Sequence, residues 1–203
     1  MTWIQTIPYE DASGELLKLY ERVKGPGNNV DNIMLAHSLR PHSMSGHMTL
    51  YKNVLHHPRN AIDKWILELL GVHTSMLNRC HYCVEHHYTG MKALLGDDDA
   101  AEKLRSQLET GEWRVMPDDR LAAALGYAEK LTLAASTLNE GDIENLRKAA
   151  WTDGEILEIN QVVSYFNYAN RTVLGLGINT EGDILGLSPN DSGDENNWQH
   201  RHA

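Results

Sequence analysis

Residues 68–87 read ELLGVHTSMLNRCHYCVEHH and contain the only two cysteines of the chain. Two residues separate Cys80 from Cys83, and His87 follows four positions after Cys83. In a helix these residues occupy positions i, i+3 and i+7, which lie on one face. We therefore expect the two thiols and the imidazole to lie close together.

The cysteine spacing is typical of redox chemistry, because a Cys-x-x-Cys dithiol can close into a small-ring disulfide. Cys80 would lie in the first turn of a helix, where free backbone amides and the macrodipole favour a thiolate. His87, one turn beyond Cys83, could instead accept the proton of that thiol. The two arguments select different sulfurs, so sequence geometry leaves open which cysteine attacks first.

Glu68 is the candidate for a third group that orients the base. It is the only acid between Asp63 and Glu85, and leucines surround it in an apolar helix. Such a carboxylate either faces solvent or is buried with a partner, because an unpaired buried charge is costly. Spacing alone leaves both possibilities open.

The rest of the chain predicts an all-α fold of about eight or nine helices. It is rich in Ala, Leu, Glu and Met, it has six prolines, and alternating strand patterns are nearly absent. We expect a short first helix that starts at Asp11 or Ser13 and stops at Gly25. Asn78 is expected to cap the helix that carries the cysteines. The remaining helices are expected over residues 30–39, 43–56, 61–76, about 79–95, 97–110, 120–135, 140–149 and 153–175.

Composition divides the chain into a single helical domain, residues 1–178, and an acidic, mobile C-terminal tail, residues 179–203. His200 and His202 in this tail are interpreted as part of a solvated terminus. The 203-residue chain has 28 acidic against 18 basic residues, a net charge of −10, so we expect no nucleic-acid partner. Without a membrane-length apolar run or a signal-peptide pattern, a cytoplasmic protein with no membrane partner is expected.

The motif resembles that of the alkylhydroperoxidase D-like (AhpD-like), or carboxymuconolactone decarboxylase, superfamily. That motif is Glu, eleven residues, Cys-x-x-Cys, three residues, His, and it matches residues 68–87. Residues 4–10, IQTIPYE, and residues 165–171, YFNYANR, are similar to the peroxidase-related branch. The resemblance covers most of residues 1–178 and implies an all-α, AhpD-like helical bundle. Asn167, Asn170 and Arg171 lie among large apolar residues, so at least one is expected in a buried polar network.

The resemblance implies an enzyme, a thiol peroxidase that reduces hydroperoxides. Glu68 and His87 would help to deprotonate Cys83, which attacks the peroxide and becomes a sulfenic acid. Cys80 would then resolve it as a disulfide, and an external dithiol would reduce the pair. No organic cofactor and no metal are implied, and a homo-oligomer is expected. Two positions depart from the family pattern, Tyr82 where a histidine is common and Leu67 where an arginine is common.

Three alternatives stay open. One is an acid–base enzyme of the decarboxylase type, although decarboxylation needs no dithiol. Another is a non-catalytic helical module with buried cysteines, since free cysteine is often buried. The third is a zinc site, which we rank below redox chemistry because no second clustered ligand pair is present. Its ligands would come from Cys80, Cys83, His86 or His87, and a distant histidine such as His47 or His73.

Overall fold

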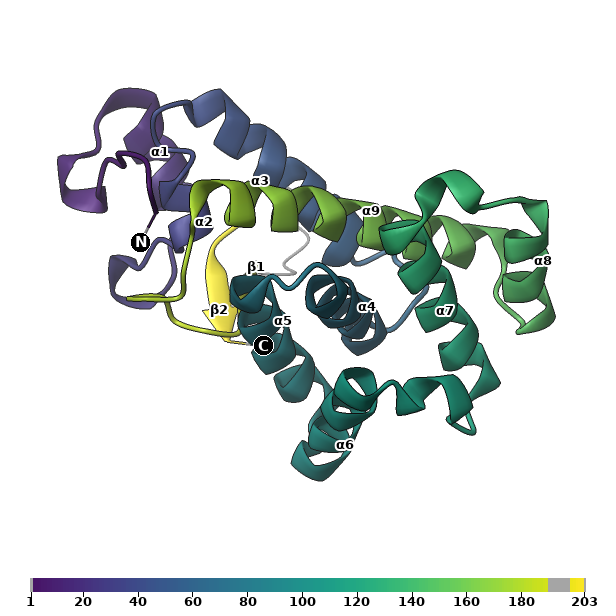
Figure 1. Cartoon of the computed structure of the whole chain (residues 1–203). Helices are drawn as coiled ribbons and strands as arrows, with labels where there is room; N and C mark the ends of the chain where they lie inside the picture. The colour runs from purple at the N-terminus through teal and green to yellow at the C-terminus, as the bar shows by residue number, and fades with distance from the viewer. Residues whose placement is uncertain (1, 190–197, 203) are drawn as a thin grey trace.

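The computed structural model describes residues 2–189 and 198–202. This part of the chain forms nine α-helices and one short two-stranded sheet, so the expected all-α fold is confirmed (Figure 1). The helices are α1 (Gly14–Val23), α2 (Asn32–Leu35), α3 (Pro41–Leu55), α4 (Lys64–Leu77), α5 (His81–Leu95), α6 (Asp98–Thr110), α7 (Asp119–Leu133), α8 (Glu140–Lys148) and α9 (Asp153–Leu176).

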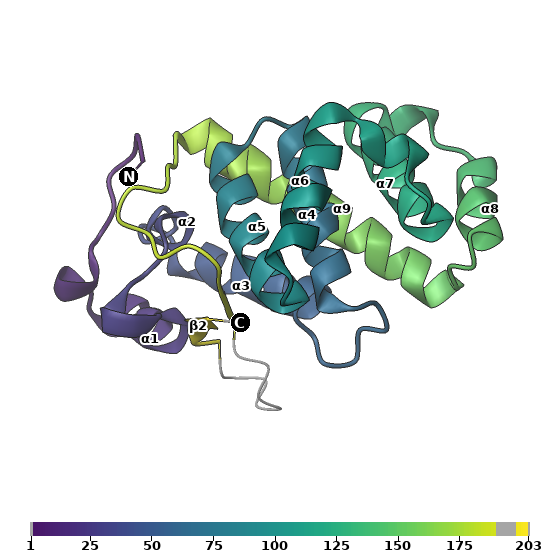
Figure 2. The same cartoon turned by 90° about the horizontal axis from the view of Figure 1, so that it is seen from below.

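Helix α4 is the centre of the bundle. It packs against α5, α7 and α9, and Figure 2 shows it between α5 and α7. Leu67, Leu69 and Leu70 are completely buried, because this helix is enclosed on nearly every side. Burial of each leucine stabilises the fold by about 1.5–3 kcal/mol. Helix α4 therefore holds Glu68, on the same segment, in a fixed position inside the protein.

The turn from α4 to α5 places the two cysteines. Asn78, expected as the N-cap of the second helix, is instead the C-cap of α4. Arg79 follows in the left-handed region with φ of 58°, and Cys80 is the N-cap of α5. The Asn78 amide donates to Asn170 Oδ1 at 2.9 Å, a contact with α9 that local sequence patterns do not reveal. Because this hydrogen bond ties Asn78 to α9, Asn78 ends α4, and Cys80, two positions later, takes the N-cap position of α5.

Helix α2 is shorter than the predicted helix over residues 30–39. It begins at Asn32, whose backbone N–H donates to the carboxylate of Asp183 at 3.0 Å. After Leu35 the chain continues in tight turns, where the N–H of His37 donates to the carbonyl of Met34 and that of Ser38 to Leu35. A cap supplied from 151 positions away sets the start of this helix, so periodicity alone placed it too early.

The C-terminal segment contains two strands, β1 (Leu187–Pro189) and β2 (His200–His202). They pair antiparallel, with Ser188 opposite Arg201. Figures 1 and 2 show them beside α5 and near the N-terminal helices. Leu187, Trp198 and His200 are buried, so the described part of the expected tail does pack on the domain. The mobility of residues 179–203 stays a prediction, part of which falls on residues 190–197 and 203, outside the described residues.

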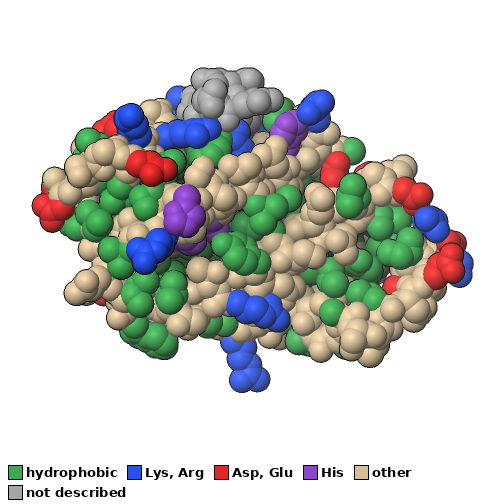
Figure 3. Space-filling view, turned by 90° about the horizontal axis from the view of Figure 1, so that it is seen from above, with side chains coloured by type: hydrophobic (Ala, Val, Ile, Leu, Met, Phe, Trp, Pro, Cys, Tyr) green, Lys and Arg blue, Asp and Glu red, His purple; other side chains and the backbone are tan. Residues whose placement is uncertain are grey.

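The surface mixes apolar and charged side chains. Hydrophobic side chains are exposed across the face seen from above, and acidic side chains gather toward its two ends (Figure 3). On α9 the exposed large apolar residues are Leu157, Tyr168 and Leu174. Within residues 2–189 and 198–202, none of the helices combines the length and apolar character needed to cross a membrane.

Candidate active site

The two cysteines form a buried dithiol. Their Sγ atoms lie 3.1 Å apart, within hydrogen-bonding distance for sulfur, and both residues are almost completely inaccessible. The hydrogen bond between the two thiols lowers the pKa of Cys80, the residue at the helix N-terminus. The same hydrogen bond and burial raise the pKa of Cys83 well above its usual value. Of the two thiols, Cys80 is therefore the easier to ionise and Cys83 the harder.

Polar side chains from two helices surround the sulfurs. Asn170 of α9 is completely buried, donates to Ser75 Oγ at 3.0 Å, and lowers the pKa of both cysteines by hydrogen bonding. Asn170 is thus the buried network member expected from the YFNYANR segment. Arg171 is exposed and donates to the carbonyl and side-chain oxygens of Asn167. The expectation of a buried polar network in residues 165–171 is confirmed, and Asn170 is the residue that belongs to it.

Glu68 is buried with a partner. Its Oε2 atom lies 2.7 Å from Nδ1 of His87, and its side chain is only 3 % exposed. A second imidazole is close, since Nε2 of His56 lies 3.7 Å from Glu68 Oε1. Burial, together with the neighbouring imidazole of His87, holds the pKa of His56 well below its usual value. The possibility that Glu68 faces solvent is wrong.

Packing fixes the ring of His87. Phe166 of α9 meets it edge to face, with the ring centroids 4.5 Å apart and the planes at 89°. Phe166 itself occupies space left by a glycine, because a Cβ atom on Gly71 would lie 2.2 Å from its ring. Helix α4 therefore holds the imidazole through the hydrogen bond to Glu68, and α9 holds it through the ring contact with Phe166.

A small cavity of about 40 Å³ lies against Cys83. Cys83, His87 and Glu68 all line it. The other polar groups on its wall come from segments far apart in sequence, and they are Asp31, His47, Tyr51, Tyr82, His86, Tyr165, Ser188 and His200. The structure thus brings three of the four predicted site residues to one cavity, and the Sγ atom of the fourth, Cys80, lies 3.1 Å from that of Cys83.

Sequence analysis missed the cavity residues Tyr51, Tyr165 and Asp31, and it named His47 only as a possible zinc ligand. Tyr51 and Tyr165 keep their hydroxyl protons, because burial raises the pKa of each well above its usual value. His47 is buried, which lowers its pKa to about 3, and its Nδ1 atom lacks a hydrogen-bond partner among the described residues. Burial also raises the pKa of Asp31 to about 7, and the nearby charge of Asp183 adds to this effect. A polar side chain at a position where an amphipathic helix should carry an apolar one is the sequence signal that could have identified the residues on helices.

The histidines considered as zinc ligands are dispersed. His86 pairs with Asp183 at 3.1 Å, and His73 packs against Trp113 in a different part of the bundle. His47 lies on the cavity wall, with its Nε2 atom 3.4 Å from the Tyr165 hydroxyl. Within residues 2–189 and 198–202, no group of three or more His, Cys, Asp or Glu side chains is arranged to hold a metal ion.

Comparison with solved structures identifies the fold. A protein from Ralstonia eutropha JMP134, described as an alkylhydroperoxidase AhpD core and an uncharacterized peroxidase-related protein, superimposes with a TM-score of 0.74. It is 22% identical, over 91% of this chain and 96% of that one. An uncharacterized peroxidase-related protein from Silicibacter sp. TM1040 gives a TM-score of 0.73 at 26% identity, over 90% and 95% of the two chains. The chain has the AhpD-like fold. This confirms the resemblance stated from the sequence.

The AhpD-like fold hosts more than one activity. The debrominase Bmp8, solved in complex with 2,3,4-tribromopyrrole, gives a TM-score of 0.68 at 14% identity, over 90% of this chain and 93% of that one. No protein-family model matches the chain, and no curated protein matches its sequence. Fold similarity therefore leaves the reaction to be argued from the AhpD-like site itself.

Proposed function

We propose that the protein is a thiol peroxidase that reduces hydroperoxides through Cys80 and Cys83. The observation that carries this proposal is the shared cavity. Cys83 lines it together with Glu68 and His87, and the Sγ atom of Cys80 lies 3.1 Å from that of Cys83. A nucleophile, a base with its orienting carboxylate, and a resolving thiol are thus the groups available to a molecule that enters.

The proton of Cys83 is the first requirement, because its pKa is raised. Glu68 accepts a hydrogen bond from Nδ1–H of His87, which leaves the lone pair on Nε2 of this imidazole free to take a proton. The carboxylate also stabilises the imidazolium that results. In this proposal His87 is the general base for Cys83, and Glu68 is its positioning residue.

The reaction then proceeds in two displacements. The Cys83 thiolate attacks the terminal peroxide oxygen, an S–O bond forms as the O–O bond breaks, and the departing alkoxide or hydroxide takes the proton from His87. The thiolate of Cys80 next attacks Cys83 Sγ, so that an S–S bond forms, the S–O bond breaks, and hydroxide leaves as water after protonation. An external dithiol supplies two electrons and two protons to restore the pair.

The resting geometry favours this cycle over acid–base chemistry of the decarboxylase type. A disulfide has an S–S length of about 2.0 Å, so the sulfurs need to approach by only about 1 Å. A lowered pKa at Cys80 supports its role as the resolving thiolate. Acid–base catalysis alone would make no use of two sulfurs in contact.

Three further expectations belong to the same proposal. The reductant is an external dithiol, and a reducing compartment such as the cytoplasm would supply it. The apolar side chains exposed on α9, Leu157, Tyr168 and Leu174, support a homo-oligomer. Sedimentation velocity tests the last point, where a monomer at every concentration would contradict it.

Peroxide consumption in the presence of dithiothreitol tests the function. The full chain should turn over hydrogen peroxide or an organic hydroperoxide, and Cys83→Ser should abolish turnover. In a single-turnover assay without dithiothreitol, Cys80→Ser should consume about one equivalent of peroxide and stop as a sulfenic acid, because it has no internal thiol to resolve it. Full turnover by the Cys83→Ser variant would contradict the proposal.

A further inference from the structure

One wall of the Cys83 cavity comes from the C-terminal segment. Leu187 and Ser188 of β1 and His200 of β2 line it, although they follow Cys83 by more than a hundred positions. Leu187 is 6 % exposed and reaches across to α1's end, since a Cβ on Gly25 would lie 2.7 Å from its Cδ1 atom. These residues supply a part of the cavity wall that comes from outside the helices.

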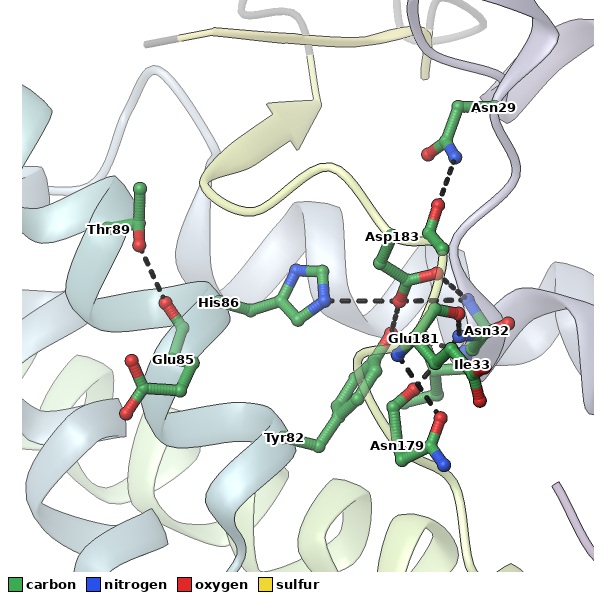
Figure 4. Close-up of polar contacts among 11 residues, drawn as sticks. Asn29, Asn32, Ile33, Tyr82, Glu85, His86, Thr89, Asn179, Glu181 and Asp183 are labelled. Atoms are coloured by element: carbon green, nitrogen blue, oxygen red, sulfur yellow. Dashed lines mark hydrogen bonds and ion pairs between the residues drawn. The ribbon is translucent and has the colours of Figure 1, made fainter. Parts of the chain in front are cut away.

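Asp183 binds this segment to α5, the helix that carries Cys83. Its buried carboxylate accepts hydrogen bonds from the Tyr82 hydroxyl at 2.8 Å and from Nε2 of His86 at 3.1 Å. Figure 4 shows both side chains pointing from α5 toward Asp183, with Asn32 on its other side. The side-chain amide of Asn32 adds hydrogen bonds to the carbonyls of Asn179 and Glu181. Tyr82 and His86, which bind Asp183, lie one position before and three positions after Cys83 in the sequence.

A second set of contacts holds the strands themselves. Nδ1 of His200 lies 2.8 Å from the carbonyl of Val23 in α1. Trp198 is buried, and the guanidinium carbon of Arg22 lies 3.3 Å from its ring centroid. Before β1 the chain touches α5 directly, because a Cβ on Gly186 would lie 2.5 Å from the Thr89 methyl carbon. The wall is therefore fixed at both of its strands and at the segment that leads into them.

The space beside Cys83 is small, and its wall combines apolar side chains with several polar groups. One water molecule needs about 10–15 Å³, so a cavity of about 40 Å³ holds about three waters. Hydrogen peroxide fits into such a volume, whereas a branched alkyl hydroperoxide does not. The tyrosine hydroxyls of Tyr51 and Tyr165 and the unpartnered Nδ1 of His47 offer hydrogen bonds to both of its oxygens and protons.

We propose that the C-terminal wall makes hydrogen peroxide, rather than a bulky alkyl hydroperoxide, the substrate of Cys83. Leu187 is the specificity-determining residue of this wall, and Asp183 is the residue that positions it. This inference rests on the proposed function and adds the substrate class. The reacting bond is the O–O bond of hydrogen peroxide, whose leaving hydroxide takes a proton and departs as water.

Stopped-flow oxidation of the reduced, full-length protein tests the inference, with hydrogen peroxide and tert-butyl hydroperoxide as the two probes. We expect the wild type to react with hydrogen peroxide about 100-fold faster, and Leu187→Ala to lower this ratio about tenfold by admitting the alkyl group. Leu133→Ala, an exposed leucine of α7, is the matched control and should keep the wild-type ratio.

Asp183→Asn provides a second test that leaves the cavity wall chemically intact. It removes the charge that holds Tyr82 and His86, so the ratio should again fall. Glu181→Gln, an exposed carboxylate of the same segment, should not change it. Equal reactivity of the wild type toward both probes overturns the inference and leaves the thiol peroxidase intact. An unchanged ratio in both Leu187→Ala and Asp183→Asn also overturns it, and oxidation by neither probe overturns both proposals.

Discussion

Glu68 and His87 form a buried carboxylate–imidazole pair, with Oε2 and Nδ1 2.7 Å apart. Glu68 lies on the central helix α4 and His87 on α5, and these two helices make the most extensive contact in the described bundle. A hydrogen bond to a carboxylate fixes both the tautomer and the orientation of an imidazole. The pair therefore leaves the other ring nitrogen of His87 free of Glu68, and His87 and Cys83 line the same cavity.

The charge of Glu68 should matter more than its shape. In Glu68→Gln the amide oxygen can still accept a hydrogen bond from His87, but the imidazolium loses its stabilising charge. We expect Cys83 oxidation to slow by about 100-fold at neutral pH, measured by stopped-flow with excess hydrogen peroxide. Glu85→Gln, which alters a carboxylate of α5 paired with Arg105, should leave the rate unchanged. Equal rates in wild type and Glu68→Gln would remove Glu68 from the mechanism.

Gly71 should be intolerant of a methyl group. The added Cβ would lie 2.2 Å from Phe166, whose ring edge supports His87. We expect Gly71→Ala to lower the free energy of unfolding by about 1–3 kcal/mol through overpacking, with a slower Cys83 oxidation as well. Gly46→Ala in α3 is the control, since nothing lies within 4 Å of its new Cβ. Urea denaturation compares the two, and equal stability would contradict the predicted clash.

Acid should destabilise the protein through its buried histidines. Burial lowers the pKa of His73 to about 4, and its unfolded-state pKa is about 6.5. As pH falls between these values the unfolded chain binds a proton that the folded chain does not, so stability decreases by up to about 1.4 kcal/mol per pH unit. His200, with a pKa lowered to about 4 by burial, acts in the same direction.

His73→Gln isolates one of these protons. Its urea midpoint should depend less steeply on pH than that of the wild type between about pH 6.5 and pH 4.5. The raised pKa of Asp31 opposes the histidines in both proteins, so it cancels in the comparison. His42→Gln, at an exposed position of α3, should retain the wild-type slope. If the urea midpoint of His73→Gln depends on pH as steeply as that of the wild type, then the pKa of this histidine is not lowered in the folded state.

Local patterns predicted the helices and the residues on their shared faces. Apolar periodicity placed α4, and the i, i+3 and i+7 spacing indicated the side of α5 that carries Cys83 and His87. Glu68 was proposed as the partner of His87 because it is the only acid of that apolar segment. These features depend on neighbours within one or two helices, and sequence spacing reports such neighbours well.

Long-range contacts account for what sequence patterns missed. Asp183 caps α2 and binds α5, although 151 positions separate it from Asn32. The acidic composition around it predicted a mobile tail that buries little apolar area, and it gave no sign that Leu187 and Trp198 would be buried. Tyr82, noted only as a departure from the family pattern, is explained by its hydrogen bond to Asp183. None of these contacts has a periodic or local signature.

The attack by Cys83 is the central claim, and trapping its first product tests it most directly. Cys80→Ser and Cys83→Ser proteins, fully reduced, are each mixed with one equivalent of hydrogen peroxide in the presence of dimedone, and the adducts are located by mass spectrometry. A rapid sulfenic-acid adduct on Cys83 of the Cys80→Ser protein, with none forming as fast on Cys80 of the Cys83→Ser protein, is the predicted result. Faster trapping at Cys80, or no adduct on either sulfur, would contradict the account.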